Sequence, residues 1–297
     1  MRRAFVLGML IVVGALSMTV AALQQQAAQA PKVVEAEKIK DNLFMLKGGG
    51  GNTAVFINAD GVTVVDAKNP GWGQPILDKI KELTPKPVTR LINSHTHGDH
   101  VSGNVEFPAT VEVVTQANTK TNMEKMDIFK TNAGRGLPKR TFTDKMTIGS
   151  GADQVDLYYF GRGHTNGDAF VVFPALRVMH AGDIFAGKNV PLIDPNNGGS
   201  MTEIGNTLQK AHDGVKNVDQ VITGHSTVMT WADLQQYAQF NKDVVAWILA
   251  QKKAGKTVDQ AVAEFKVPEK YTGFSGNVNP LFGGLKGLIQ GVYDGAL

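Results

Sequence analysis

A short segment of the chain, His95-Thr96-His97-Gly98-Asp99-His100, carries the residue types best suited to chemistry. It holds three of the seven histidines, with a carboxylate between them. Imidazole binds zinc, copper, iron and nickel, and a mixed set of imidazoles and carboxylates favours zinc. Two histidines one residue apart can hold one cation, and the Asp-His pair that follows can face a second. The segment therefore predicts a dinuclear metal site.

The residues before this segment predict how it is positioned. Residues 88–93 (VTRLIN) form an apolar, β-branched run typical of a buried strand, and a polar loop begins at Ser94. A loop at the end of a strand holds ligands on a stiff support and leaves them open to solvent. A histidine-rich surface turn is the alternative interpretation. The pattern H-E-x-x-H of helical zinc proteases does not match this segment.

Further candidate ligands follow other expected strands. His164, Asp183 and His225 each stand in a glycine-containing segment at the end of an apolar run. Loops of this kind could meet along one rim of the fold. His180 and His212 lie instead on an expected strand and near the end of an expected helix, where a lone histidine is usually structural.

The combined pattern H-x-H-x-D-H, then Gly-His-Thr, Gly-Asp and Gly-His, resembles the metallo-β-lactamase superfamily in order and spacing. The resemblance extends from about residue 40 to about residue 250. It implies two metal ions and a role for each ligand. The first metal would be held by His95, His97 and His164, the second by Asp99, His100 and His225, with Asp183 bridging them and Asp66 supporting the site from behind.

The implied activity is hydrolysis by a zinc-bridging hydroxide, since zinc lowers the pKa of bound water to about 7. Asp99 would orient this nucleophile or accept its proton. The bond cleaved would be an ester, lactone, thioester or amide, and iron or manganese could replace zinc. A β-lactamase and a non-catalytic metal-binding protein are the alternatives.

The residue types around the ligands bear on the substrate. Many zinc β-lactamases have cysteine or serine at the position of Asp183, so we expect weak β-lactam hydrolysis beside hydrolysis of another ester or lactone. Lys188 is a candidate for binding a substrate carboxylate, or else a solvated lysine. Asn166 and Asn197 are weaker candidates of the same kind. We expect specificity to lie in loops, with 128–139 a mobile polar loop and 186–200 a second one.

The pattern of elements predicts the fold class. Strand-like runs outnumber helical ones, and the helices flank groups of strands. This arrangement predicts a four-layer αβ/βα sandwich, in which two mixed sheets pack face to face with helices outside. The clearest helix begins at the capping box Thr230-Trp231-Ala232-Asp233 and ends before Gly255. Residues 31–297 are expected to form one domain, with a helical extension from about residue 256.

Composition excludes several classes of function. The 297 residues include no cysteine, so disulfides, thiolate ligands and a cysteine nucleophile are excluded. The net charge is only +3, and no run of lysine and arginine indicates nucleic-acid binding. We therefore expect a small-molecule substrate. The sequence carries no signal for an oligomeric state.

The N-terminal segment predicts export. Arg2 and Arg3 precede an uncharged stretch that ends at Ala28-Gln29-Ala30, a pattern typical of a signal-peptidase site. Residues 1–30 are thus expected to be a signal peptide, and the mature chain to be periplasmic or secreted without stable membrane association. An uncleaved anchor is the alternative, because about 20 apolar residues can span a bilayer. The paired arginines leave both Sec and twin-arginine export open.

Overall fold

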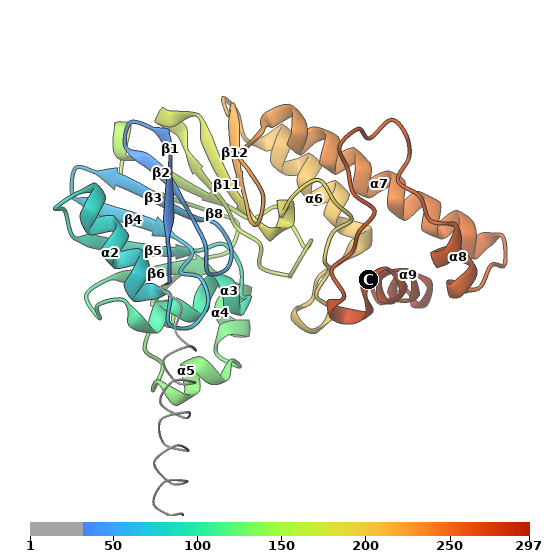
Figure 1. Ribbon diagram of the computed structural model, residues 1–297, viewed down its shortest axis with the longest axis horizontal. Coiled ribbons are helices and arrows are strands. Elements are labelled where there is room, and N and C mark those ends of the chain that lie inside the picture. The colour runs from blue at the N-terminus through green and yellow to red at the C-terminus, as the bar shows by residue number, and fades with distance from the viewer. Residues whose placement is uncertain (1–31) are drawn as a thin grey trace, which may run out of the picture. The chain divides into compact units, whose positions relative to one another are not determined.

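The fold is built from two β-sheets that face each other, with helices on the outer face of each (Figure 1). The computed structural model describes residues 32–297, of which Val34–Leu297 form one compact unit. The predicted αβ/βα sandwich is therefore confirmed. The expected signal peptide, residues 1–30, lies outside the described residues.

The first sheet has seven strands in sequence order. The pairs from β1 to β4 are antiparallel, whereas β4, β5, β6 and β7 run parallel to one another. Since parallel neighbours place their carboxyl ends at the same edge, the loops after β4 and β5 meet there. The strands are β1 (Glu35–Lys40), β2 (Leu43–Lys47), β3 (Thr53–Asn58), β4 (Gly61–Val65), β5 (Val88–Asn93), β6 (Glu112–Gln116) and β7 (Arg140–Phe142).

The second sheet has six strands in the order β13-β12-β11-β10-β9-β8. Only β11 and β12 pair in parallel, so their carboxyl ends also share one edge. The strands are β8 (Lys145–Ile148), β9 (Val155–Tyr158), β10 (Phe170–Phe173), β11 (Val178–Gly182), β12 (Gln220–Thr223) and β13 (Met229–Thr230).

Helices cover both sheets and extend beyond the second one. α2 lies over the first sheet, α6 and α7 lie over the second, and α8 and α9 follow beyond them (Figure 1). The helices are α2 (Gly73–Leu83), α3 (Gly98–Val101), α4 (Ala117–Met123), α5 (Asp127–Thr131), α6 (Met201–Gly214), α7 (Trp231–Lys253), α8 (Val258–Glu264) and α9 (Gly284–Asp294). Short 3-10 turns include Asp183–Phe185, Pro195–Asn197 and Leu281–Gly283.

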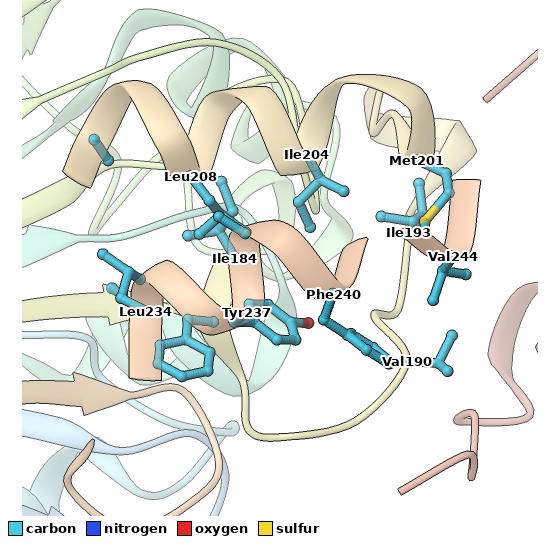
Figure 2. Packing of buried hydrophobic residues seen from close by; sticks show 14 of the residues in the cluster. Ile184, Val190, Ile193, Met201, Ile204, Leu208, Leu234, Tyr237, Phe240 and Val244 are labelled. Carbon is cyan, nitrogen blue, oxygen red and sulfur yellow. The ribbon is translucent and has the colours of Figure 1, made fainter. Parts of the chain in front are cut away.

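Apolar side chains fill the space between the layers. Phe56 of β3 and Phe173 of β10 bring their rings to 5.1 Å between the two sheets. Outside the second sheet, Leu234 and Phe240 of α7 belong to the same buried cluster as Leu208 of α6 (Figure 2). Burial of such side chains removes apolar area from water and supplies the main driving force for folding.

The ends of α7 confirm the signals read from the sequence. The Thr230 hydroxyl accepts a hydrogen bond from Asp233 N, and the Asp233 carboxylate accepts one from Thr230 N. At the other end Gly255 has a φ of +74°, the left-handed conformation that glycine adopts without strain. These caps satisfy backbone groups that a helix leaves unpaired.

The segment 128–139 corrects one expectation. It was predicted to be a mobile polar loop, but its first residues belong to α5 and Phe129 is only 1% exposed. Phe129 packs in a small cluster with Val101 and Met123. The sequence around Phe129 is polar, yet this one aromatic side chain attaches the segment to α3, the helix that carries Asp99 and His100.

Among the described residues, no helix combines the length and apolar character that a membrane span requires.

We expect Phe129→Ala to lower the free energy of unfolding by about 3 kcal/mol, because the change leaves a cavity where an aromatic ring is buried. Lys130→Ala, at the neighbouring exposed position, is the matched control and should change stability by less than about 0.5 kcal/mol. Urea denaturation measures both. Equal effects of the two variants would contradict the anchoring role of Phe129.

Candidate metal centre

The ends of four strands converge at one edge of the sandwich. Asp66 follows β4, His95 follows β5, Asp183 follows β11 and His225 follows β12. His164 comes from the loop between β9 and β10. Parallel pairing within each sheet therefore places side chains from distant parts of the chain together, as the sequence predicted.

The structure groups all the predicted ligands. Within each of three groups, one ligand atom per residue lies within 4.8 Å of the others. The groups are His95, His97, His164 and Asp183; Asp99, His100 and His225; and Asp66, His95 and His100. The first two match the sets expected for two ions, and Asp183 also touches the second set at 3.1 Å from His225 Nε2.

The third group contains Asp66, which holds the side chains of His100 and, through Ser94, of His95 in place. This fully buried carboxylate accepts hydrogen bonds from Ser94 N at 2.7 Å and Ser94 Oγ at 2.6 Å. Its Oδ2 also lies 2.7 Å from His100 Nδ1. His100 Nδ1 is therefore engaged by Asp66, which leaves Nε2 directed at the other ligands.

The outer nitrogens of the first histidine group are also occupied. Nδ1 of His164 lies 2.6 Å from the Leu192 carbonyl oxygen, and Nε2 of His97 lies 2.7 Å from Asp194 Oδ2. Because both partners only accept, these nitrogens are the protonated ones. The remaining nitrogens, His164 Nε2 and His97 Nδ1, then face each other as lone pairs at 2.8 Å. Two lone pairs at this distance repel unless a cation lies between them.

His95 provides a second test of fit for a metal. The Ser94 hydroxyl donates to Asp66, so its oxygen accepts from His95 Nδ1 at 2.9 Å. Among the described residues, His95 Nε2 is buried and has no hydrogen-bond partner, and the same is true of Asp183 Oδ1. Buried polar atoms are almost always satisfied, and unpaired ones indicate a missing ligand. The donor set therefore fits a cation bound by nitrogen and oxygen.

The second group surrounds His225 Nε2. Asp99 Oδ2 lies 3.2 Å away and His100 Nε2 lies 3.3 Å away. Unlike the first group, this one is open to the solvent, since the His225 side chain is 40% exposed and that of Asp99 is 31% exposed. The centre thus has a closed side at His95 and an accessible side at His225.

Electrostatics differ between the two sides. Burial lowers the pKa of His164 to about 4, and burial together with His100 holds the pKa of His95 well below its ordinary value. Burial would also lower the pKa of His225, but Asp183 and Asp99 raise it to about 9. Asp183 stays ionised because, against its burial, His100 holds its pKa well below the ordinary range. Neutral imidazoles and an ionised carboxylate are the forms that bind metals. His95, His164 and Asp183 are already in these forms at neutral pH, whereas His225 has to release a proton when it binds a metal.

Two glycines let the backbone approach the ligands. A Cβ at Gly51 would lie 2.1 Å from His100 Cε1, and one at Gly224 would lie 1.9 Å from Asp183 Oδ1. Any larger residue would displace a ligand side chain.

Several residues of the centre were missed by the sequence analysis. Asp194 fixes His97 and also accepts from Asn197 Nδ2 at 2.6 Å. Asp168, whose pKa burial raises to about 7, accepts from Thr165 beside His164. Lys68 is fully buried and donates to the Gly51 carbonyl at 2.7 Å. The clustered Asp-Pro-Asn-Asn at residues 194–197 was a signal for Asp194, whereas nothing local marked Asp168 or Lys68.

The weaker substrate candidates have other partners. The Lys188 ammonium lies 2.6 Å from Asp233 and faces the Phe274 ring at 5.8 Å. The Asn166 side chain accepts from Asn122 of α4 at 2.9 Å and so links this helix to the loop after β9. Asn197 holds Asp194 as described above. Both asparagines therefore have a structural role in the described residues.

The two histidines expected to be structural lie outside the ligand groups. Nε2 of the buried His180 lies 3.1 Å from the Asn52 carbonyl oxygen, and its Nδ1 accepts from Gly182 N. The His212 ring stacks on Trp231 at 5.1 Å. Both rings are satisfied without a metal.

A cavity of about 780 Å³ opens onto the exposed side of the centre. It is lined by His97, Asp99, Asp183 and His225, by the segment after β11, and by residues 273–282 from the C-terminal part of the chain. Of the two expected specificity loops, 186–200 contributes to the lining and 128–139 does not.

We expect Asp66→Asn to weaken binding of the more loosely held metal by about 10- to 100-fold, because an amide cannot accept from Ser94 and His100 at once. Competition with a chelating dye measures this. Asp156→Asn is the control: Asp156 is a buried carboxylate in β9 that accepts from Thr147 at 2.6 Å, away from the centre. Equal metal affinity in both variants would show that Asp66 does not orient the ligands.

Comparison with known proteins supports the geometry. The profile of the metallo-beta-lactamase superfamily matches residues 46–246. A metallo-beta-lactamase type 2 from Elizabethkingia meningoseptica is 26% identical over 237 residues, which cover 74% of this chain and 88% of the relative. A hydroxyacylglutathione hydrolase from Nostoc punctiforme is 29% identical over 160 residues, and the match spans about half of each chain, 54%.

Solved structures share the fold. A metallo-beta-lactamase from Pontibacter korlensis superposes with a TM-score of 0.60 at 19% identity, covering 71% of this chain and 99% of its own. The sec-alkylsulfatase Pisa1 from Pseudomonas sp. reaches a TM-score of 0.71 at 15% identity, covering 89% of this chain and 50% of its own. The superfamily profile covers 201 of the 297 residues, or 68% of this chain. The alkylsulfatase match covers 89% and therefore extends beyond the residues that the profile matches.

The superfamily profile matches more than half of the chain and includes every residue in the two ligand sets. The chain belongs to the metallo-beta-lactamase superfamily, and it is a metal-binding hydrolase of small molecules.

Proposed function

We propose that the protein is a dinuclear zinc hydrolase that cleaves an uncharged ester, lactone, thioester or amide. The observation that carries this choice is the pairing of Lys188 with Asp233 at 2.6 Å. Among the described residues that line the cavity, Lys188 is the only lysine or arginine. With its charge compensated, this part of the lining offers no free cation outside the metal centre for a substrate carboxylate.

Two zinc ions would occupy the two ligand sets, with Asp183 shared between them. When bound, zinc polarises a carbonyl oxygen and makes water acidic enough to act as a nucleophile. Nitrogen and carboxylate ligands without sulfur also suit iron or manganese. The histidines would keep fixed tautomers during turnover, because their outer nitrogens are held by Asp66, Ser94, Asp194 and the Leu192 carbonyl.

Asp99 is the residue we propose to handle the proton. It lines the cavity, and its carboxylate is partly exposed. Burial alone would raise the pKa of Asp99, but the hydrogen bond from His225 lowers it, so the carboxylate is ionised at neutral pH. An ionised carboxylate at the open side of the centre can accept a proton and release it to solvent.

Hydrolysis of β-lactam antibiotics is the second candidate. It is favoured by the likeness to the Elizabethkingia enzyme and by the position of Lys188 in the cavity wall. Residues 1–30 would act as an export signal in either case, and the mature protein would work in the periplasm or outside the cell.

We expect the zinc-loaded protein to retain about two zinc ions per chain after gel filtration. Asp183→Ala should reduce this to about one or fewer, because it removes the ligand shared by both sets. His180→Asn, at a buried histidine outside the sets, should keep both ions. Elemental analysis with protein quantification measures the ratio, and a wild-type value near zero would refute the metal site.

We expect kcat/KM for p-nitrophenyl acetate or a small lactone to exceed that for nitrocefin by about tenfold or more. Asp233→Asn should lower the ratio of the ester kcat/KM to the nitrocefin kcat/KM several-fold, because it frees Lys188 to bind the nitrocefin carboxylate. Asp243→Asn is the matched control, since Asp243 lies on the same helix and pairs with Lys270 at 2.6 Å. Nitrocefin turnover well above that of the esters in the wild type would establish the β-lactamase alternative.

A further inference from the structure

A second, smaller cavity adjoins the one at the metal centre. It has a volume of about 230 Å³ and lies between the segment after β11 and the C-terminal helix α9. The two cavities share Leu192, Leu281 and Phe282 in their walls. The two cavities therefore adjoin at three apolar side chains.

The smaller cavity has an apolar lining. Its walls include Pro191, Ile193, Val278 and Leu288, as well as the three shared residues. The only charged side chain in the lining is Asp294, whose carboxylate accepts from Gln290 at 2.8 Å on the same helix. A ligand group that gains by entering this space has to be apolar and uncharged.

Two of the shared residues are exposed apolar side chains. Leu281 is 58% exposed and Phe282 is 37% exposed, whereas the other exposed large apolar side chains of the described residues, Val33 and Leu249, line neither cavity. Leu281 and Phe282 are adjacent in sequence and line both cavities, so this apolar pair faces the space that a substrate would enter. Apolar side chains in a cavity wall are the usual contacts for an apolar part of a ligand.

The backbone holds these side chains in place under strain. Phe282 has a φ of +55°, a left-handed conformation that is unfavourable for an aromatic residue. Gly283 and Gly284 follow with positive φ, and a Cβ at Gly287 would lie 1.9 Å from the Phe282 carbonyl oxygen. Strained residues persist where the surrounding structure requires them, commonly at ligand sites.

The segment before these residues is attached to the wall of the metal cavity. Ser275 N donates to the Lys188 carbonyl at 2.9 Å, and Val190 N donates to the Ser275 carbonyl at 3.3 Å. After the segment, α9 buries Leu288, Ile289 and Val292 in the main core of this side. Leu281 and Phe282 thus lie between two anchored stretches.

We propose that this part of the chain, residues 278–288, forms a subsite for the aliphatic or aromatic portion of the substrate. The scissile bond would lie at the metal centre, and the apolar portion would pass Leu281 and Phe282 into the smaller cavity. The inference rests on the proposed function for the identity of the scissile bond. The apolar subsite itself rests on the two cavities and the residues between them.

The first test uses a series of p-nitrophenyl esters from acetate to decanoate on the zinc-loaded protein. We expect kcat/KM to rise by roughly threefold to fourfold for each added methylene until the cavity is filled. Leu281→Glu should abolish this dependence on chain length. Leu249→Glu is the control, because Leu249 is an exposed leucine on α7, 45% exposed, that lines neither cavity.

The second test is independent of activity. Fluorescence of the neutral probe N-phenyl-1-naphthylamine should rise on binding to the wild type and to Leu249→Glu, and 1-decanol should displace it while ethanol does not. Leu281→Glu should bind the probe at least about tenfold more weakly, since it places a charge in an apolar wall. Circular dichroism of each variant establishes that the fold is retained. If Leu281→Glu unfolds, Phe282→Gly, which removes the ring and relieves the positive φ, takes its place with the same expectation.

Two results separate the subsite from the proposed function. Ester hydrolysis with no dependence on chain length, or probe binding that is equal in the wild type and the folded subsite variant, would overturn the subsite. Absence of hydrolysis with probe binding that the subsite variant weakens would overturn the proposed ester chemistry and support the subsite.

Discussion

The buried Asp66 carboxylate links the fold to the metal centre. It directly follows β4, has a φ of +67°, and accepts hydrogen bonds from Ser94, directly after β5, and from His100 in α3. These contacts fix the tautomer of His100 directly and that of His95 through the Ser94 hydroxyl. A carboxylate buried without such donors would be costly, so the strand ends and the ligands have to be built together.

The same requirement explains the rest of the ligand shell. His97 and His164 present lone pairs to each other only because Asp194 and the Leu192 carbonyl hold their outer nitrogens. Both of these partners belong to the segment after β11, which also forms one wall of the cavity. The segment that orients His97 and His164 therefore also lines the cavity that a substrate would enter. Substitutions there would change metal affinity and substrate specificity together.

Beyond the superfamily region, the C-terminal residues complete the cavity. The sandwich supplies the metal centre, and such centres support many reactions on one fold, so substrate choice depends on what surrounds them. Here the surroundings are Lys188, compensated by Asp233, and the apolar pair Leu281 and Phe282. Both features favour an uncharged substrate with an apolar portion.

The sequence by itself predicted which side chains meet at the centre, because His95-Thr96-His97-Gly98-Asp99-His100 and the Gly-His and Gly-Asp segments each follow an apolar run within a few residues. It also predicted the confirmed fold class from the order of strand-like and helical runs. Caps such as Thr230 with Asp233 were predictable for the same reason. Only the tertiary structure decided the pairing of Lys188, the roles of Asp194 and Lys68, and the place of Leu281 beside the metal cavity. These features depend on contacts between segments that are distant in sequence. The residues next to each side chain do not indicate which distant residue it will contact, so the sequence alone could not predict them.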